Sequence, residues 1–350
     1  QDDCAAAFDL LALQRAAAPG RGAAFERISC LGEGAFGVVW LAKRLADGRR
    51  FALKEISRGR VAGSDEVQRR VWEERAALTA IAEARSSEDR ASPPALVGLV
   101  ESFATASALC LVMDLAEGVP LHELVRSAGR LPEESARCYA AEVAGALEWL
   151  HSAGWLYRDL KLSNVVISTS ARAHLVDFGF AKCAERTNSV VGTLHTMAPE
   201  VIRCASEPSK DYGCEVDWWS LGVLLFEVLA GEPPFGYHDD VHLEGAEVLA
   251  KQASAAQKGL PWPKPPSKAA REAVSALLEL DAKQRLGDVR KQRFFASFNW
   301  ASLPSMEARG PRLAALDAAA EARTQPRRPR RGQPSTTPCP MEGPDPFEGF

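Results

Sequence analysis

Two short runs of the sequence carry side chains that could transfer a phosphoryl group. The first, residues 157–164, contains Asp159, Lys161 and Asn164, and the second begins at Asp177, thirteen residues after Asn164. Asp159 could accept the proton of a substrate hydroxyl, and Lys161 could contact the phosphate in transfer. Asn164 and Asp177 offer the oxygen ligands that Mg²⁺ prefers. The plainer alternative is an ordinary Asp-rich loop, but two such runs at this separation favour phosphoryl transfer.

A glycine-rich segment with Gly32, Gly34 and Gly37 precedes these runs. Three glycines allow backbone amides to approach phosphate oxygens without side-chain collision. The spacing alone is a weak signal, because a dinucleotide-binding turn or a plain hairpin turn shares it. Lys54 follows among the apolar residues 51–56, and a lysine there needs a buried anionic partner. Nucleotide phosphates or a helix glutamate could supply that partner, whereas a solvated lysine at a strand edge is the alternative.

The apolar pattern indicates the elements that would position these side chains. Residues 25–56 and 96–115 alternate apolar and polar residues, which is typical of strands. Residues 65–84 are predicted to be helical, and further helices are predicted at 133–152, 216–230 and 268–280. The helix at 216–230 is apolar nearly all round, so we expect it to be buried. The pattern predicts a small sheet-rich lobe followed by a larger helical lobe.

Composition bounds the class of protein. The 350 residues are 46% hydrophobic and 25% charged, with a net charge of -4, so there is room for two lobes and no general argument for binding nucleic acid. Eight cysteines without a C-x-x-C pair are typical of reduced thiols in a cytosolic protein. No apolar run reaches the ~18 residues of a membrane span. The chain starts at Gln1 rather than Met, which is typical of a fragment.

The two ends differ in composition from the middle of the chain. Residues 1–24 are alanine-rich and are expected to form an N-terminal helix or linker that ends at Pro19-Gly20. Residues 301–350 are interpreted as a C-terminal tail, partly disordered. The basic run at 327–331 is interpreted as a solvated tail segment, with a nuclear-import or anionic-lipid patch as the alternative.

Together these residues resemble the eukaryotic protein kinase family over about residues 25–300. The narrower resemblance is to the AGC group of serine/threonine kinases, especially its cyclic-nucleotide-dependent members. Four strings carry it, at residues 157–161, 177–182, 217–222 and 293–300. The resemblance implies an α+β, bilobal fold. It places a small antiparallel-sheet lobe with one main helix at about 25–115, and a larger, mostly helical lobe at about 118–300.

The resemblance implies ATP and Mg²⁺ as cofactors. It makes Asp159 the catalytic base, with Mg²⁺ bound by Asn164 and Asp177. Catalysis is also expected to involve Lys161, Thr193 and Lys54, with Glu74 pairing Lys54 and Glu73 as the neighbouring alternative. Besides Lys54, the residues expected to contact ATP are Leu31, Gly32, Glu33, Gly34, Ala35, Phe36, Gly37, Val38, Val39, Ala52, Met113, Asp114, Ala116 and Val166.

Arg158, beside the catalytic aspartate, implies control by phosphorylation, because a cation there requires an anion. Ser189 is the expected phosphorylated residue. The alternative is that Arg158 pairs with a nearby carboxylate such as Glu185. Thr187 is the second candidate for phosphorylation, and the anion site would be completed by Lys182 and Arg70.

Structural roles are also implied by the resemblance. Glu200 is expected to form a buried pair with Arg285, and Asp217 belongs to the same structural set. The chain ends in Phe347-Glu-Gly-Phe350, which is similar to the group's terminal F-x-x-F motif, whose rings dock on the small lobe. A chance pair of aromatic residues on a disordered tail is the alternative.

The sequence departs from the family where substrate is recognised. Ser163 and Pro120 stand where the nearest relatives carry glutamates that recognise substrate arginine. Glu227 is the one acidic residue left of that set, so it is predicted to recognise substrate, and preference for arginine upstream of the target residue is in question.

These features predict an active serine/threonine protein kinase, and Lys161 favours Ser/Thr over Tyr. The alternative is a pseudokinase or scaffold that binds nucleotide or a partner without catalysis. A nicotinamide-binding oxidoreductase is rejected, because a second strand rather than a helix follows the glycines. Expected partners are protein substrates with Ser or Thr, an upstream activating kinase, and a cyclic-nucleotide-binding regulatory domain or subunit. The cytoplasm is the expected location, with the nucleus as a second.

Overall fold

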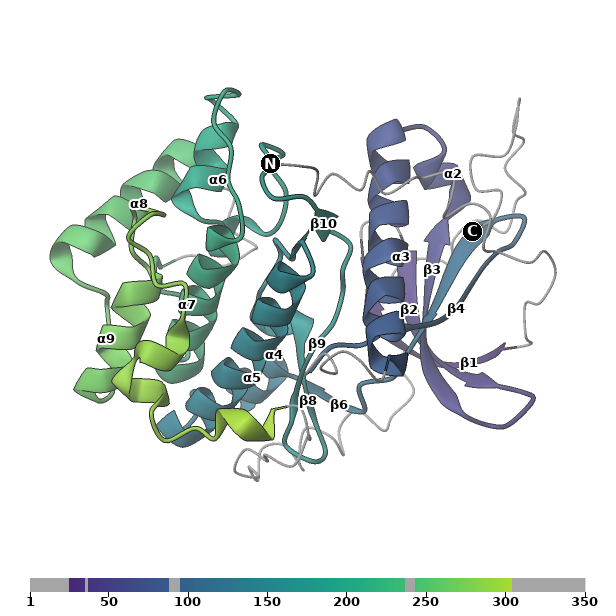
Figure 1. Cartoon of the computed structure of the whole chain (residues 1–350), viewed down its shortest axis with the longest axis horizontal. Helices are drawn as coiled ribbons and strands as arrows, with labels where there is room; N and C mark the ends of the chain where they lie inside the picture. The colour runs from purple at the N-terminus through teal and green to yellow at the C-terminus, as the bar shows by residue number, and fades with distance from the viewer. Residues whose placement is uncertain (1–24, 35–36, 88–94, 237–242, 304–349) are drawn as a thin grey trace. The chain divides into compact units, whose positions relative to one another are not determined.

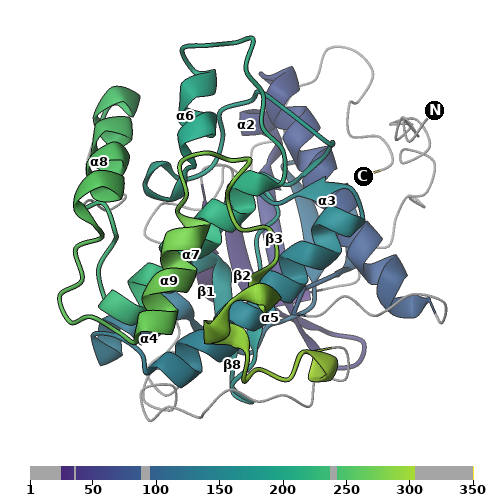
Figure 2. The same cartoon turned by 60° about the vertical axis from the view of Figure 1, so that its left-hand side comes forward.

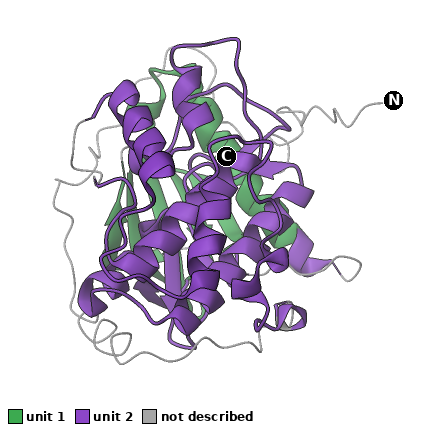
Figure 3. Ribbon diagram, turned by 90° about the vertical axis from the view of Figure 1, so that its left-hand side faces the viewer, with its two compact units in different colours: residues 1–83, 97–115, 325–350 green, residues 84–96, 116–324 purple. Residues whose placement is uncertain are grey.

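The chain separates into two compact units, which Figure 3 shows in different colours. Unit 1 comprises residues 1–83, 97–115 and 325–350, and unit 2 comprises residues 84–96 and 116–324. The structure is a computed structural model that describes residues 25–34, 37–87, 95–236, 243–303 and 350. The expected N-terminal helix and nearly all of the expected tail, including the basic run at 327–331, therefore lie outside the described residues.

Unit 1 is built on an antiparallel sheet of five strands in the order β1-β2-β3-β5-β4 (Figure 1). Helix α3 (Asp65–Ser86) is its main helix and begins with Asp65 and Glu66, which favour the positive end of the helix dipole. The strands are β1 (Phe25–Glu33), β2 (Gly37–Arg44), β3 (Arg50–Ser57), β4 (Leu99–Ala104) and β5 (Ala108–Met113), and a short helix α2 (Arg58–Val61) follows β3. The predicted small sheet lobe with one main helix is confirmed.

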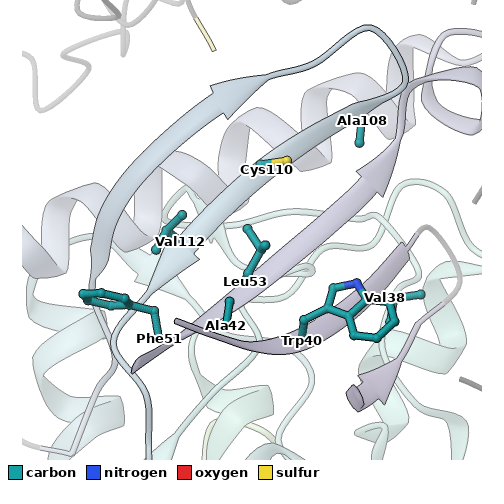
Figure 4. Packing of buried hydrophobic residues seen from close by; sticks show 8 residues of the cluster. All are labelled: Val38, Trp40, Ala42, Phe51, Leu53, Ala108, Cys110 and Val112. Atoms are coloured by element: carbon teal, nitrogen blue, oxygen red, sulfur yellow. The ribbon is translucent and has the colours of Figure 1, made fainter. Parts of the chain in front are cut away.

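The two faces of this sheet have different tasks, because side chains alternate along each strand. One face carries a buried apolar cluster, which Figure 4 shows: Val38, Trp40, Ala42, Phe51, Leu53, Ala108, Cys110 and Val112. Arginine side chains add to it, since Arg44 and Arg49 lie over the ring of Phe51. Lys54, one position out of phase with this cluster, faces α3 instead. The alternation thus places the apolar cluster on one face of the sheet and the Lys54 side chain on the other.

Unit 2 is mostly helical, as the sequence predicted. Its principal helices are α5 (Glu133–Ser152) and α7 (Glu215–Ala230), and α7 packs against both α5 and α9 (Figure 2). The predicted burial of α7 is confirmed, because nearly all of its side chains are buried. The other elements are β6 (Gly118–Pro120), α4 (Leu121–Ala128), β7 (Trp155–Leu156), β8 (Val165–Ser168), β9 (Ala173–Leu175), β10 (Lys182–Cys183), α6 (Pro199–Cys204), α8 (Gly245–Lys258) and α9 (Lys268–Leu277). Short 3₁₀ turns η1 (Leu162–Asn164), η2 (Leu194–Thr196), η3 (Val289–Lys291), η4 (Arg293–Phe295) and η5 (Trp300–Ser302) complete it.

Two boundaries differ from the sequence prediction. Residues 84–87 and 95–96 were placed in the small lobe, yet they group with unit 2. The backbone N–H of Leu175 donates to the carbonyl of Ala95, and Leu96 forms a bridge with Leu175. Helix α9 ends at Leu277 rather than at residue 280. Asp281 begins a new turn, in which its carbonyl accepts the N–H groups of Gln284 and Arg285, so the helix does not continue. Among the described residues, no helix is both long and apolar enough to cross a membrane.

Candidate active site

The loop between β7 and β8 in unit 2 is held by one buried carboxylate. Asp217 on α7 accepts the backbone N–H of Tyr157 at 3.0 Å and that of Arg158 at 2.7 Å. It also contacts His151 Nε2 at 2.8 Å. Arg158 has a φ of 70°, a left-handed conformation that costs a non-glycine residue roughly 1 kcal/mol or more and persists only where its surroundings hold it. Asp217 supplies that restraint, and the next residue of the loop is Asp159.

Asp159 lies at the centre of a cluster of polar side chains. Thr193 donates its hydroxyl to Asp159 Oδ1 at 2.6 Å, and Asn164 donates Nδ2 to Asp159 Oδ2 at 2.9 Å. The ammonium of Lys161 reaches both Thr193 Oγ1 at 2.7 Å and Asp159 Oδ2 at 3.0 Å. Gly192 permits this approach, because a Cβ at that position would lie 2.4 Å from the carbonyl oxygen of Arg158. The structure thus brings three of the predicted residues, Lys161, Asn164 and Thr193, around the carboxylate of Asp159.

The environment of Asp159 changes its acidity. Burial raises the pKa of this carboxyl above its ordinary value, and nearby Asp177 acts in the same direction. Lys161 and the hydrogen bond from Thr193 oppose the rise in pKa, because both favour the charged form. A carboxylate with a raised pKa accepts a proton more readily, which is the direction that a general base requires.

The two predicted metal ligands lie on neighbouring segments. The backbone N–H of Val176, next to Asp177, donates to the carbonyl of Asn164 at 2.9 Å. Asp177 has a φ of 63° and its Oδ1 accepts the N–H of Gly179 at 3.2 Å, so the carboxylate is held at a tight turn. Among the described residues, no three His, Cys, Asp or Glu side chains gather to hold a metal. Mg²⁺ does not need such a group, because it commonly takes one or two protein oxygens with phosphate and water. The donor set therefore fits Mg²⁺ bound together with a nucleotide.

Unit 1 carries the predicted lysine–glutamate pair. Lys54 Nζ on β3 lies 2.5 Å from Glu74 Oε1 on α3, and the Glu74 side chain is only 4% exposed. Of the two candidate glutamates, Glu74 is therefore the one placed against Lys54. A buried carboxylate fixes the direction of the lysine side chain, which is itself 16% exposed. This is a fixed cation suited to phosphate.

The glycine-rich turn lies between β1 and β2. Gly34 N–H donates to the carbonyl of Gly37 at 2.9 Å, and a Cβ at Gly37 would lie 1.8 Å from the carbonyl oxygen of Glu55. Glycine at 37 is therefore required by the close approach of β3. Ala35 and Phe36, predicted to contact ATP, lie outside the described residues.

The residues predicted to contact ATP are divided between the units. In unit 1, Ala52 pairs with Met113 and Val39 pairs with Lys54 across neighbouring strands. Val38 differs, because its side chain belongs to the apolar cluster on the opposite face of the sheet, so only its backbone could contact a nucleotide. The others in unit 1 are Leu31, Gly32, Glu33 and Asp114, whereas Ala116 and Val166 belong to unit 2.

The predicted regulatory residues of unit 2 form a hydroxyl-rich cluster. Arg158 Nη1 donates to Ser189 Oγ at 2.6 Å, and Lys182 Nζ donates to Thr187 Oγ1 at 3.3 Å. The Arg158 side chain also meets the Phe180 carbonyl and the Tyr212 hydroxyl, at 2.7 and 3.4 Å, and among the described residues it contacts no carboxylate. The alternative pairing with Glu185 is therefore wrong. Arg70 belongs to unit 1, where it pairs with Glu66.

Sequence reasoning missed two partners in unit 2. Tyr212, whose backbone pairs with Thr187, also donates its hydroxyl to the Ser189 carbonyl at 2.5 Å. His195, two residues after Thr193, lies 3.5 Å from Glu227. Both contacts join positions far apart in the sequence, so no local spacing could indicate them.

The predicted pair of Glu200 and Arg285 is present with two hydrogen bonds, at 2.5 and 3.1 Å.

Phe350 lies within unit 1 and is 3% exposed. Its ring contacts Trp72 edge-on, with centroids 5.2 Å apart, and Arg75 lies over it at 5.8 Å. Ser102 Oγ donates to the Phe350 carbonyl at 2.7 Å. The last aromatic residue of the F-x-x-F motif is thus docked between α3 and β4, and Phe347 lies outside the described residues.

Comparison with known proteins agrees with this geometry. Residues 25–295 match the family model of the protein kinase domain. The cAMP-dependent protein kinase catalytic subunit of Dictyostelium discoideum is 33% identical over 295 residues, which cover 82% of this chain and 42% of that protein. Protein kinase C zeta type of Oryctolagus cuniculus is 32% identical over 299 residues, covering 82% of this chain and 48% of that protein. RAC-beta serine/threonine-protein kinase of Homo sapiens is 33% identical over 287 residues, covering 79% and 55%. The chain thus spans about half the length of the curated relatives it matches.

Proposed function

Because this chain belongs to the protein kinase family, we propose that it transfers the γ-phosphoryl group of ATP to serine or threonine hydroxyls of protein substrates. The observation that carries the proposal is the buried carboxylate of Asp159, which contacts Thr193, Lys161 and Asn164 at 2.6–3.0 Å. A structural loop has no need of a cation, a hydroxyl and an amide converging on one acid. The serine/threonine kinases among its relatives support the same reaction.

Each group has a role that follows from its chemistry. Asp159 orients the substrate hydroxyl and accepts its proton, which its raised pKa favours. Lys161, held by Thr193, stabilises negative charge that develops on the transferring phosphate. Lys54, fixed by Glu74, binds the phosphates of ATP. Asn164 and Asp177 would hold Mg²⁺, which supplies neutralisation of phosphate charge.

The proposal extends to regulation and surroundings. Phosphorylation of Ser189, or of Thr187 beside it, would place a dianion within reach of Arg158 and Lys182. Their present hydrogen bonds to hydroxyls support this assignment, because the same cations bind phosphate more strongly. An upstream kinase and a cyclic-nucleotide-binding regulator are the proposed partners. The cytoplasm, with the nucleus as a second place, is the proposed location.

A transfer assay tests the reaction. Radiolabelled ATP is supplied with Mg²⁺ over arrayed peptides that carry Ser, Thr or Tyr as the single acceptor, and EDTA provides the metal-free control. We expect labelling of Ser and Thr peptides that EDTA abolishes. Nucleotide binding without labelling, even after treatment with an activation-loop kinase, would contradict the proposal and indicate a scaffold.

A further inference from the structure

Unit 2 contains a buried acid whose partner is an imidazole. Glu227 on α7 is 5% exposed, and its Oε1 lies 3.5 Å from Nε2 of His195, which is 8% exposed. A carboxylate that is removed from water needs a hydrogen-bond donor or a cation, and His195 supplies one or the other according to its protonation. The acid is therefore satisfied from within the chain.

The pair is close to the reacting centre of unit 2. Thr193 donates to Asp159 at 2.6 Å, and His195 follows two residues later, a span of at most about 7 Å. The backbone around His195 is anchored, because Ser220 donates to the Thr196 carbonyl and Gln252 donates to the Met197 carbonyl, each at 2.9 Å. These hydrogen bonds hold the imidazole against Glu227.

The two other positions of the predicted recognition set carry no charge. Ser163 is exposed beside Lys161, and Pro120 is buried at the end of β6. Glu227 is the acid that could meet a substrate arginine from this set. An incoming guanidinium would have to displace the imidazole from a buried carboxylate, and would gain little from exchanging one donor for another.

We propose that His195 is a specificity-determining residue: by occupying Glu227 it removes selection for arginine upstream of the target hydroxyl. The substrates are then Ser/Thr segments in which an arginine upstream of the target hydroxyl gives no advantage. The inference rests on the proposed kinase function and defines its substrate class. His195 acts by competing for Glu227 and does not touch the reacting atoms.

The test compares two peptides that differ only by Arg or Gln at one upstream position, scanned over several positions. Affinity is measured by fluorescence anisotropy with alanine at the acceptor position, and kcat/KM is measured with serine there. The wild-type protein is expected to show an Arg/Gln ratio within about threefold of one. His195→Ala removes the imidazole from the Glu227 carboxylate, so the ratio should rise about tenfold at one position, as a charge-assisted hydrogen bond allows. The double variant H195A/E227Q should return the ratio to the wild-type value.

Arg290→Ala is the matched control, because it also releases a carboxylate, Glu148, but at the α5–η3 contact. It should leave the ratio unchanged. The inference would be overturned if the wild-type protein preferred arginine tenfold and Glu227→Gln abolished that preference. This comparison does not depend on whether H195A folds. An unchanged ratio in folded H195A would overturn it as well. Peptide binding without phosphate transfer would contradict the kinase proposal alone, since the anisotropy ratios still report on His195.

Discussion

The buried pair of Arg285 and Glu200 should be one of the most sensitive points of unit 2. The Arg285 side chain is 0% exposed and that of Glu200 is 15% exposed. Arg285 makes two hydrogen bonds to Glu200, donates to the carbonyls of Glu215 and Glu279 at 2.9 and 3.0 Å, and lies over the ring of Trp219 at 5.1 Å. One guanidinium thus links α6, α7 and the turn that follows α9.

Arg285→Met should be strongly destabilising. It leaves the Glu200 carboxylate without its cation, and breaking a buried pair from one side costs about 3–5 kcal/mol. At about 2–4 °C per kcal/mol for a domain of this size, the unfolding midpoint should fall by about 6–20 °C. Thermal unfolding followed by circular dichroism measures this shift, and the double variant E200Q/R285M should lose less than R285M because no buried charge remains unpaired.

The control is the pair of Arg290 and Glu148, whose side chains are 51% and 28% exposed. Arg290→Ala should cost less than about 1 kcal/mol, because solvent screens an exposed pair. Equal losses of stability in R285M and R290A would refute the reasoning. A double variant E200Q/R285M that is less stable than R285M would refute it as well.

Three further predictions concern other parts of the chain. Burial raises the pKa of Glu142 from 4.5 to about 7, so its contribution to stability is fully present below about pH 4.5 and is lost as the pH rises to about 7. The free energy of unfolding of Glu142→Gln should therefore increase by on the order of 3 kcal/mol relative to that of wild type across this pH range, as measured by urea titrations. A difference that does not change with pH would contradict the assignment. Thr193→Val removes the hydroxyl between Asp159 and Lys161, so kcat should fall about 10- to 100-fold while the unfolding midpoint stays unchanged. An unaltered kcat would show that this hydroxyl does not position the catalytic groups. Phe350→Ala uncovers Trp72, which should shift tryptophan emission to the red and cost about 1.5–3 kcal/mol, and an unshifted spectrum would place the ring elsewhere in solution.

Much of the fold could be predicted from the sequence, because the patterns concerned are local. Helix α7 was predicted from a run of residues that is apolar nearly all round, and the strands of unit 1 were predicted from alternation of apolar and polar residues. Each pattern lies within one element of the chain. Val38 shows how the same rule narrows a family-based expectation, because its side chain is assigned to the apolar face and only its backbone is left to contact ATP. It is two residues from Trp40 on the same strand, so period-two alternation alone assigns both to one face.

The site was predictable where function requires fixed spacing, and less so where partners are distant. Asp159, Lys161, Asn164 and Asp177 share one short stretch of chain, so their types and separations indicate the chemistry. The pairing of His195 with Glu227 joins η2 to α7, and tertiary packing decides it. Arg158 likewise satisfies its charge with carbonyl and hydroxyl groups, including that of Tyr212, 54 residues away.

The central claim is that Asp159 performs phosphoryl transfer chemistry while the nucleotide is bound by other groups. Its most direct test is the rate of phosphate transfer by Asp159→Asn, measured beside the affinity of the same variant for Mg-ATP. Asparagine keeps the size of the side chain and cannot accept the proton, so transfer should fall about 10²- to 10⁴-fold with the affinity for ATP within about twofold of wild type. Transfer at the wild-type rate in this variant would contradict the claim.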